Sequence, residues 1–372
     1  MKKNEVFDLA SYLSDGVENI VVGAIKASIS NPKESIFLAK FALACKQAKK
    51  LRLEAEKNGE HIPPFLIASI TSKCNLHCAG CYARSNHACH DKEVNDQLTD
   101  EEWLKIFHDA KSVGVAFILL AGGEPMMRPE VIRAAGKIQD ILFPIFTNGT
   151  MINEEYINMF LKYRNLVPVL SIEGDENATD TRRGEGVYRK IFHAMDSLQQ
   201  NKIFYGASVT VTKENLKEVT SVEFLDNLRK RECKLVFYVE YVPVASNSKE
   251  SAPEAAEREY LNDELLKLRQ SYEDLLLISF PGDEKASGGC LAAGRGFFHI
   301  NSHGGAEPCP FSPYSDTSLK NTSLKEAMNS PLFRKLRDSN VLIEDHSGHV
   351  GGCVLFEREE LVRTVAGSCI QA

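Results

Sequence analysis

Residues 65–82 read FLIASITSKCNLHCAGCY, an apolar run that leads directly into three closely spaced cysteines. The run has the length of a buried strand, and the loop after it holds Cys74, Cys78 and Cys81 in a CxxxCxxC spacing. Three thiolates can hold a [4Fe–4S] cluster and leave one iron open to a further ligand, as a catalytic centre requires. Structural zinc and plain buried cysteines are the alternatives, although zinc favours paired CxxC knuckles and the chain has no second pair.

Beyond this loop, short apolar runs alternate with longer segments of helical periodicity. The strands are expected at 65–70, 116–120, 144–147, 168–172, 205–212 and 235–242. The helices between them are expected at 99–113, 129–141, 153–163, 187–201 and 216–231. This alternation predicts βαβ units and a parallel sheet. Six units predict an α/β fold, a partial (β/α)6 TIM-like barrel with its active groups at the carboxyl ends of the strands.

The chain divides into four segments. Residues 1–62 are expected to form a helical N-terminal extension, interrupted at Asn31-Pro32, and residues 63–245 the partial barrel. Residues 246–287 are expected to be a linker and a helix, and residues 288–372 a small cysteine-containing domain stapled by a metal or cluster. The N-terminal helices are expected to cap the barrel, with an interface to a membrane or partner as the alternative, since apolar and lysine-rich stretches lie close together.

The composition is that of a globular protein. The 372 residues are 43% hydrophobic and 26% charged, with a formal net charge of -7, so no nucleic-acid partner is expected. No apolar run reaches the length of a membrane span, and the N-terminal residues show no secretory signal. Ten cysteines without such a signal favour metal or cluster ligation over disulfides, and a cytoplasmic location.

A second motif, Ala121-Gly122-Gly123-Glu124-Pro125, follows the next expected strand. A glycine pair allows the backbone to approach a ligand closely, and Glu124 adds a carboxylate. Because parallel strands end at the same edge of a sheet, this motif is expected beside the cysteine loop.

The ordered motifs resemble the radical S-adenosylmethionine (radical SAM) enzyme superfamily. The resemblance covers roughly residues 65–245 and rests on the cysteine loop with Tyr82, Gly122–Pro125, Thr147-Asn148-Gly149, Ser171-Ile172-Glu173-Gly174 and Arg183-Gly184. It implies an enzyme that reductively cleaves S-adenosylmethionine at a [4Fe–4S] cluster to a 5′-deoxyadenosyl radical, which abstracts hydrogen from a substrate. A non-catalytic iron–sulfur electron carrier, or a metal-binding protein on a degenerate barrel, is the alternative.

The same resemblance implies a role for each matching residue. Cys74, Cys78 and Cys81 would hold the cluster. The contacts to S-adenosylmethionine would come from Tyr82 near the adenine, from Gly122, Gly123 and Glu124 at the methionine amino group, from Ser171 and Glu173 near the ribose or methionine end, and from Arg183 at the carboxylate. Strand-end capping or surface charge stays an alternative for Thr147, Asn148, Ser171, Glu173 and Arg183.

The C-terminal segment resembles the SPASM/twitch extension of many radical SAM enzymes. After a short strand-turn pattern at 297–301, the dense later cysteine run of that extension is missing, so one auxiliary iron–sulfur cluster is expected. Its ligands would be Cys290, Cys309 and Cys353. The fourth ligand stays open among Cys369, Asp345, His346, His349 and the substrate, and a zinc site is the alternative.

Several further points stay open in the sequence. The substrate could be a peptide, a cofactor precursor, a sugar or a lipid-like molecule, although the helical N-terminus lacks the strands of a winged peptide-binding domain. The expected electron donor is a low-potential protein such as flavodoxin or ferredoxin. Cys45, Cys89 and Cys233 are interpreted as plain residues, with a redox role as the alternative for Cys89. Neither Glu240 nor Tyr241 can be assigned as an acid or base.

Overall fold

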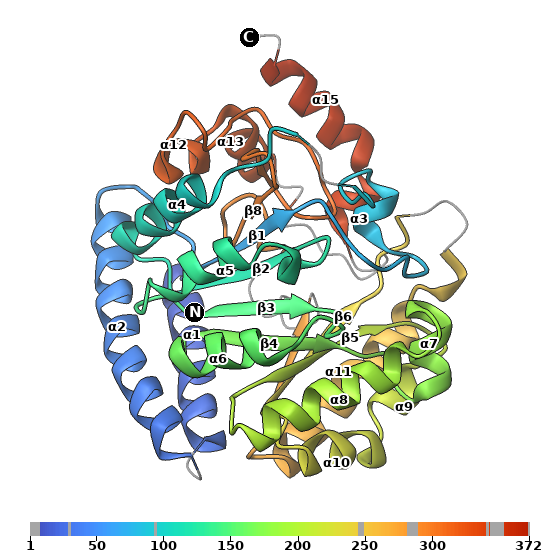
Figure 1. Ribbon diagram of the computed structural model, residues 1–372. Coiled ribbons are helices and arrows are strands. Elements are labelled where there is room, and N and C mark those ends of the chain that lie inside the picture. The colour runs from blue at the N-terminus through green and yellow to red at the C-terminus, as the bar shows by residue number, and fades with distance from the viewer. Residues whose placement is uncertain are drawn as a thin grey trace, which may run out of the picture.

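The computed structural model describes residues 8–28, 31–92, 95–244, 249–280, 289–339, 342 and 353–370. Its centre is a nine-stranded sheet in the order β7-β6-β5-β4-β3-β2-β1-β8-β9 (Figure 1). The parallel strands are β1 (Phe65–Thr71), β2 (Phe117–Gly122), β3 (Phe143–Thr147), β4 (Leu166–Ser171), β5 (Gly206–Val211), β6 (Leu235–Glu240) and β7 (Leu276–Phe280). Successive strands are neighbours in the sheet, as a partial barrel requires, so the predicted α/β fold class is confirmed.

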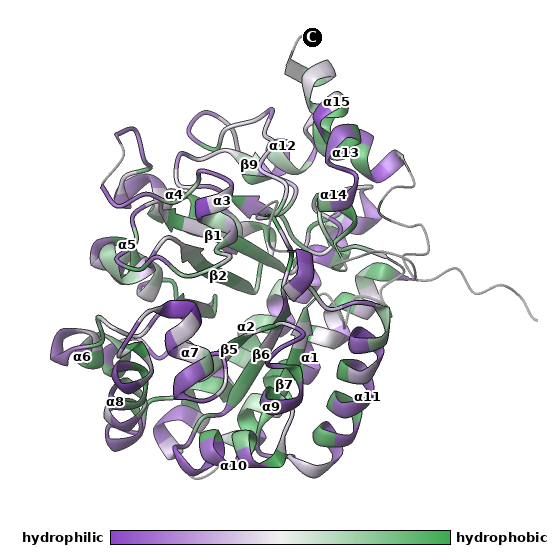
Figure 2. Cartoon of the chain, turned by 90° about the vertical axis from the view of Figure 1, so that its right-hand side faces the viewer, coloured by the Kyte–Doolittle hydropathy of each residue, from purple (hydrophilic) through white to green (hydrophobic). Residues whose placement is uncertain are grey.

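Helices connect the strands on the outside of the sheet (Figure 1). They are α3 (Tyr82–Ser85), α4 (Asp100–Val113), η1 (Pro125–Met127), α5 (Pro129–Gly136), α6 (Glu154–Lys162), α7 (Glu176–Arg183), α8 (Val187–Gln200), α9 (Leu216–Val219), α10 (Val222–Lys230), η2 (Lys249–Ser251) and α11 (Ala255–Ser271). Helix α4 begins at a capping box between Thr99 and Glu102, which satisfies two backbone N–H groups that the helix leaves without partners. In Figure 2 such helices carry both hydrophilic residues (purple) and hydrophobic residues (green), for example α11.

Besides the short elements α3, η1 and η2, the structure adds strand β7 and helix α7 to the predicted strands and helices. Strand β7 lies within 246–287, where a linker and a helix were expected, because its sequence LLISF is too short to show a period. Helix α7 is almost wholly polar and buries Thr179 alone, so no apolar periodicity reveals it. The helix expected at 216–231 is divided into α9 and α10, because Ser221 caps a new helix.

The two faces of the sheet differ in exposure. Side chains such as Leu66, Ile118 and Leu170 are fully buried under the connecting helices. On the opposite face several side chains, such as Phe65, Phe117 and Ser171, are only half-buried. The strand registers align them: Phe65 pairs with Phe117, and Ser171 pairs with the buried Ser208. We call this half-buried side the inner face. It is the face on which a partial barrel binds its ligands.

The N-terminal extension, expected to be helical, forms a hairpin of two helices. Helix α1 (Leu9–Ala27) and helix α2 (Pro32–Lys57) are separated at Asn31, whose side chain caps α2. Their apolar sides pack against the amino ends of the strands, where the ring of Phe41 meets Phe117 edge-on at 5.6 Å between centroids. The hairpin therefore closes one end of the barrel and leaves the carboxyl ends of the strands at the other (Figure 1).

The C-terminal segment extends the same sheet. Strand β8 (His299–Ile300) pairs in parallel with β1, and β9 (Ala306–Glu307) returns antiparallel to it as a short hairpin. Four helices follow: α12 (Leu324–Met328), α13 (Pro331–Asp338), α14 (Val354–Glu357) and α15 (Glu359–Ile370). In the part of the chain that the structure describes, no helix is long and apolar enough to cross a membrane.

Candidate functional site

The cysteine loop follows β1 and is held by a returning segment of chain. The backbone N–H of Cys74 donates to the carbonyl of His90 at 3.0 Å, and the N–H of His90 donates to Ser72 at 2.7 Å. Cys74, Cys78 and Cys81 are all half-buried, and Cys81 immediately precedes α3. The hydroxyl of Tyr241 comes from the end of β6 and lies against Gly80 in the middle of the loop. The loop is therefore fixed at both sides while its thiols stay accessible.

Charges around the loop favour the thiolate at Cys74. A hydrogen bond from the Cys89 thiol lowers the pKa of Cys74, and the backbone N–H of Leu76 and the charge of Arg84 lower it further. Burial raises the pKa of Cys78, while the guanidinium groups of Arg183 and Arg182 oppose that rise. Since the thiolate is the form that binds iron, three accessible thiols beside positive charges fit an iron–sulfur cluster.

Two further observations concern the cysteine loop. The contact between Cys89 and Cys74 could not be predicted from the sequence, in which only the two histidines that flank Cys89 draw attention to it. Residues 86–91 come next to the cysteine loop because the folded chain turns back on itself. Within the described ranges, no three His, Cys, Asp or Glu side chains are grouped so that they could hold a single metal ion.

The glycine pair after β2 makes room for this loop. A Cβ on Gly122, whose φ is +124°, would lie 2.3 Å from the carbonyl oxygen of Thr71, and one on Gly123 would lie 2.2 Å from that of Lys73. The N–H groups of Gly123 and Glu124 donate to these same carbonyls at 2.8 Å each. The motif thus binds the start of the cysteine loop to the end of β2.

Replacing Gly123 by alanine is expected to displace the loop and lower its capacity for iron. The new Cβ would overlap the Lys73 carbonyl and press on the Cys74 N–H, so we expect a destabilisation of about 1–3 kcal/mol and a clear loss of bound iron after reconstitution. Gly16→Ala is the matched control, because nothing lies within 4 Å of its Cβ position in α1. Equal iron content in both variants would contradict the close approach.

Glu124 is buried at the junction of β2 and β3. Its carboxylate accepts hydrogen bonds from the Thr147 hydroxyl at 2.7 Å, the Asn148 N–H at 2.8 Å and the Met126 N–H at 3.0 Å. Thr147 and Asn148 therefore have the strand-end role that the sequence left open. Burial raises the pKa of Glu124 to about 7, although these three donors act to lower it.

This buried carboxyl predicts a pH dependence of stability. The folded pKa of about 7 lies above the ordinary value of 4.5, so the folded state binds the proton more tightly than the unfolded state. The contribution is most favourable below pH 4.5 and is lost as the pH rises towards 7, by about 3 kcal/mol. Urea unfolding of the wild type and of Glu124→Gln across this range measures it. A constant difference between the two proteins would show that Glu124 does not titrate there.

A second buried carboxylate, Glu173, lies at the end of β4 and holds two arginines. It forms ion pairs with Arg182 at 2.6 Å and Arg183 at 2.5 Å, and accepts from the N–H of Thr210 at 3.2 Å. Burial acts to lower the pKa of Arg183, but the charges of Glu173 and Cys78 outweigh it and hold the pKa above its usual range. The carbonyl of Arg182 accepts from Ala79 N–H at 2.7 Å, so this cluster contacts the cysteine loop.

Sequence reasoning singled out Glu173 and Arg183 but missed Arg182. The adjacent basic pair Arg182-Arg183 was the available signal, although only helix α7 turns both side chains toward Glu173. Ser171 is half-buried on the inner face, in register with Ser208 of β5. The structure therefore brings Glu173 and Arg183 together with the cysteine loop, and places Ser171 at the same end of the sheet.

Tyr82 connects the cysteine loop to the C-terminal segment. Its ring meets Phe311 edge-on at 5.0 Å, and burial together with the charges of Cys81 and Cys309 raises the pKa of Tyr82. Cys309 is itself buried. The expected contact of Tyr82 with the adenine would therefore have to involve a ring that already packs against Phe311.

The three expected auxiliary ligands lie on separate turns. The turn after Cys290 meets the turn before Cys309, since the Ala293 N–H donates to the carbonyl of Pro308 at 3.1 Å. Cys353 precedes α14, and Cys369 lies on α15. The other candidates for a fourth ligand, Asp345, His346 and His349, lie outside the described residues.

A buried polar chain that the sequence did not suggest joins β8 and β9 to β1. His299 contacts the Ser69 hydroxyl through Nε2 and Glu307 through Nδ1, at 2.7 Å each, and Asn301 donates to Glu307 at 2.6 Å. Ser69 and His299 lie on the same side of adjacent strands. The chain ties the C-terminal segment to the strand that carries the cysteine loop.

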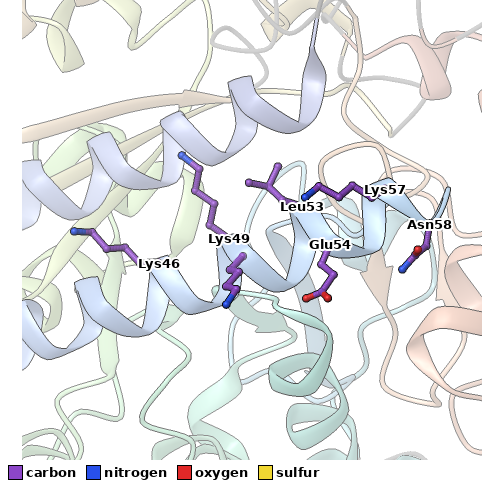
Figure 3. A pocket seen from close by; sticks show the side chains of 7 residues that line it. Lys46, Lys49, Leu53, Glu54, Lys57 and Asn58 are labelled. Carbon is purple, nitrogen blue, oxygen red and sulfur yellow. The ribbon is translucent and has the colours of Figure 1, made fainter.

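A shallow hollow elsewhere is lined by a lysine-rich part of α2 (Figure 3). Its residues are Lys46, Lys49, Lys50, Leu53, Glu54, Lys57 and Asn58. This hollow lies on the hairpin that covers the amino ends of the strands, away from the cysteine loop (Figure 1).

The barrel region of the chain is similar to proteins of known family. Residues 68–225 match the model of the radical SAM superfamily. The AdoMet-dependent heme synthase of Methanosarcina barkeri is 27% identical over 317 residues, which cover 78% of this chain and 88% of that protein. The Fe-coproporphyrin III synthase of the same organism is 27% identical over 180 residues, which cover 48% of this chain and only 44% of that protein.

Other similar proteins include a peptide-maturation protein and a solved structure. The sporulation killing factor maturation protein SkfB of Bacillus subtilis is 26% identical over 167 residues, 44% of this chain and 39% of that protein. The crystal structure of Streptococcus suis SuiB has a TM-score of 0.65 at 17% identity, over 81% of this chain and 73% of that chain. This structural likeness supports the fold.

Proposed function

The chain is a radical SAM enzyme with a SPASM/twitch-type C-terminal region, and from this premise we propose that Cys74, Cys78 and Cys81 hold its catalytic [4Fe–4S] cluster. The observation that supports these ligands most directly is the loop of three half-buried thiols at the carboxyl end of β1, next to Arg182 and Arg183. When bound, the cluster and S-adenosylmethionine supply a 5′-deoxyadenosyl radical that takes a hydrogen atom from the substrate.

Around that loop, we assign the binding of S-adenosylmethionine to groups at the carboxyl ends of the strands. The backbone of Gly122 and Gly123 and the carboxylate of Glu124 would receive the methionine amino group. Arg183 contacts Glu173 through Nε and Nη2, so its Nη1 is the nitrogen we assign to the methionine carboxylate. Glu173 would then act by orienting Arg183.

On the ribose and adenine side, the assignments are to a hydroxyl and an aromatic ring. Ser171 would bind the ribose from the inner face, and Tyr82 would contact the adenine through the part of its ring that Phe311 does not cover.

We assign the auxiliary iron–sulfur cluster to Cys290, Cys309 and Cys353. The hydrogen bond between Ala293 and Pro308 holds the first two turns together, and burial of Cys309 shields one ligand from solvent. The electron donor is proposed to be a low-potential flavodoxin or ferredoxin. A cytoplasmic location is proposed, because low-potential clusters need a reducing compartment.

A spectroscopic experiment tests the enzyme against the electron-carrier alternative. The anaerobically reconstituted and reduced protein is titrated with S-adenosylmethionine while the electron paramagnetic resonance spectrum is recorded. We expect the spectrum of the catalytic cluster to change, because the open iron gains ligands. An unchanged spectrum, with iron content verified, would favour a carrier that does not bind S-adenosylmethionine.

We propose that the substrate is a tetrapyrrole, such as an iron porphyrin. Four half-buried aromatic rings lie on the inner face. Phe146 and Phe237 pack against each other and the apolar cluster of the hairpin, and Phe65 and Phe280 pack against Phe297. The parts of these rings that remain exposed suit a large flat apolar molecule. One relative, 27% identical over 317 residues, is a heme synthase, and a second one is an Fe-coproporphyrin III synthase. The described residues 9–57 form helices, with none of the strands of a winged peptide-binding domain.

A peptide is the second candidate, because SkfB matures a killing factor and SuiB has been crystallised with its precursor peptide SuiA. The test uses Fe-coproporphyrin III as the probe. We expect its absorption band to shift on binding, and the yield of 5′-deoxyadenosine to rise. Phe237→Ala should weaken binding at least fivefold, whereas Val222→Ala, on the exposed surface of α10, should not. A protein that forms 5′-deoxyadenosine but ignores the porphyrin would refute the substrate proposal and leave the enzyme class intact.

A further inference from the structure

The outer side of the N-terminal hairpin carries large apolar side chains in contact with solvent. Val22 on α1 is 50% exposed, and Ile36 and Leu43 on α2 are 59% and 67% exposed. These are three of the seven large hydrophobic residues that are exposed in the described part of the chain. Ile36 and Leu43 are seven residues apart, so they lie on one stripe of the helix.

Lysines surround this stripe. Lys33, Lys40, Lys46 and Lys50 are exposed along α2. The only acidic residue between positions 32 and 53 is Glu34, which is buried and paired with Arg164 at 3.0 Å. Together the seven residues Val22, Lys33, Ile36, Lys40, Leu43, Lys46 and Lys50 form what we call the hairpin outer face. This positive face belongs to a chain of net charge -7.

The rest of the hairpin is committed to the fold and holds this face in place. Phe37, Phe41 and Cys45 point from α2 into the apolar cluster over the strand ends. Lys49 turns toward α1, where it pairs with Asp15 and Glu18 at 3.2 Å each. The outer face is therefore preformed, and binding to it requires no folding of the helices.

The position of the face argues against an electron carrier as its partner. The hairpin covers the amino ends of the strands, whereas the cysteine loop lies at their carboxyl ends (Figure 1). A redox partner docked on α2 would be separated from the cluster by the length of the barrel. Lysines interleaved with exposed aliphatic side chains are instead the pattern of a helix that lies in a lipid interface.

We propose that the hairpin outer face docks on an anionic lipid bilayer. Ile36, Leu43 and Val22 enter the boundary between headgroups and acyl chains, and the four lysines contact lipid phosphates. The helices then lie parallel to the membrane plane, and the carboxyl ends of the strands face away from the bilayer. This proposal is independent of the substrate and of the cluster ligands.

Co-sedimentation of the full chain with vesicles tests it. We expect binding to vesicles of phosphatidylcholine with phosphatidylglycerol, and at least tenfold weaker binding to phosphatidylcholine alone. Ile36→Ser combined with Leu43→Ser should weaken the anionic binding at least fivefold, and reversal of the four lysines to glutamate should abolish it. The control is Val222→Ser with Leu266→Ser, which removes two residues of similar exposure, 60% and 57%, from α10 and α11.

Each other result overturns the proposal. If the wild type ignores anionic vesicles, the face has another partner. If the aliphatic substitutions leave binding unchanged, the protein is adsorbed by charge alone, as an acidic protein surface would also bind it. If the control variant loses binding equally, the contact lies elsewhere. Thermal melting of each variant verifies that its fold is intact, since all the substituted positions are exposed.

Discussion

A variant in which Cys74, Cys78 and Cys81 are replaced by alanine is expected to release no 5′-deoxyadenosine above the enzyme-free background. The three thiols share one loop, and the charges of Cys74 and Cys81 act on the pKa of Cys78, so we propose them together as one ligand set. If they hold the cluster, their removal leaves S-adenosylmethionine without its iron, and an enzymatic acceleration on the order of 10⁶-fold or more is lost. Anaerobic incubation with S-adenosylmethionine and dithionite, followed by mass spectrometry, measures the product.

Cys45 and Cys233 provide matched controls for this variant. Both are buried, and burial raises the pKa of each thiol to about 12, which makes them poor metal ligands. Replacing either by serine should leave the yield of 5′-deoxyadenosine nearly unchanged. If the triple variant kept its product, or if a control lost it equally, the assignment of the loop as ligand set would be wrong.

Glu173→Gln is expected to destabilise the fold by about 3–5 kcal/mol. The carboxylate is 1% exposed, and its loss leaves Arg182 and Arg183, at 17% and 10% exposure, without their buried counter-charge. The free energy of unfolding in urea measures the effect. Because Arg182 also holds the loop through Ala79, we expect the variant to bind iron less well after reconstitution.

The neighbouring ion pair between Glu176 and Arg189 gives the control for Glu173. Both side chains are largely exposed, at 49% and 81%, so Glu176→Gln should cost less than about 1 kcal/mol. Comparable losses in the two variants would mean that the buried ion pairs of Glu173 stabilise the fold no more than an exposed pair does. A loss of S-adenosylmethionine binding without a loss of stability would assign Glu173 a direct ligand role.

Much of the architecture was predictable from the order of residues. The six strands and the break at Asn31-Pro32 are confirmed, because apolar periodicity and capping residues act over a few neighbouring positions. The resemblance to the radical SAM superfamily was recognisable as well, since its motifs lie in order at the ends of successive strands, and residues 68–225 match the model of that superfamily. Strand β7 and helix α7 were missed, the first being too short and the second too polar to show a period.

The tertiary structure decided which side chains meet. The family resemblance assigned Glu173 and Arg183 to one site, but their pairing with each other and with Arg182 depends on the path of α7 over the sheet. Cys89 likewise meets Cys74 because the chain bends back after the cysteine loop. His299 meets Ser69 although the two residues are distant in the sequence. Helices, strands and caps depend on residues close together in the sequence, so they can be predicted from it. Contacts between strands depend on register and packing, which exist only once the sheet has formed.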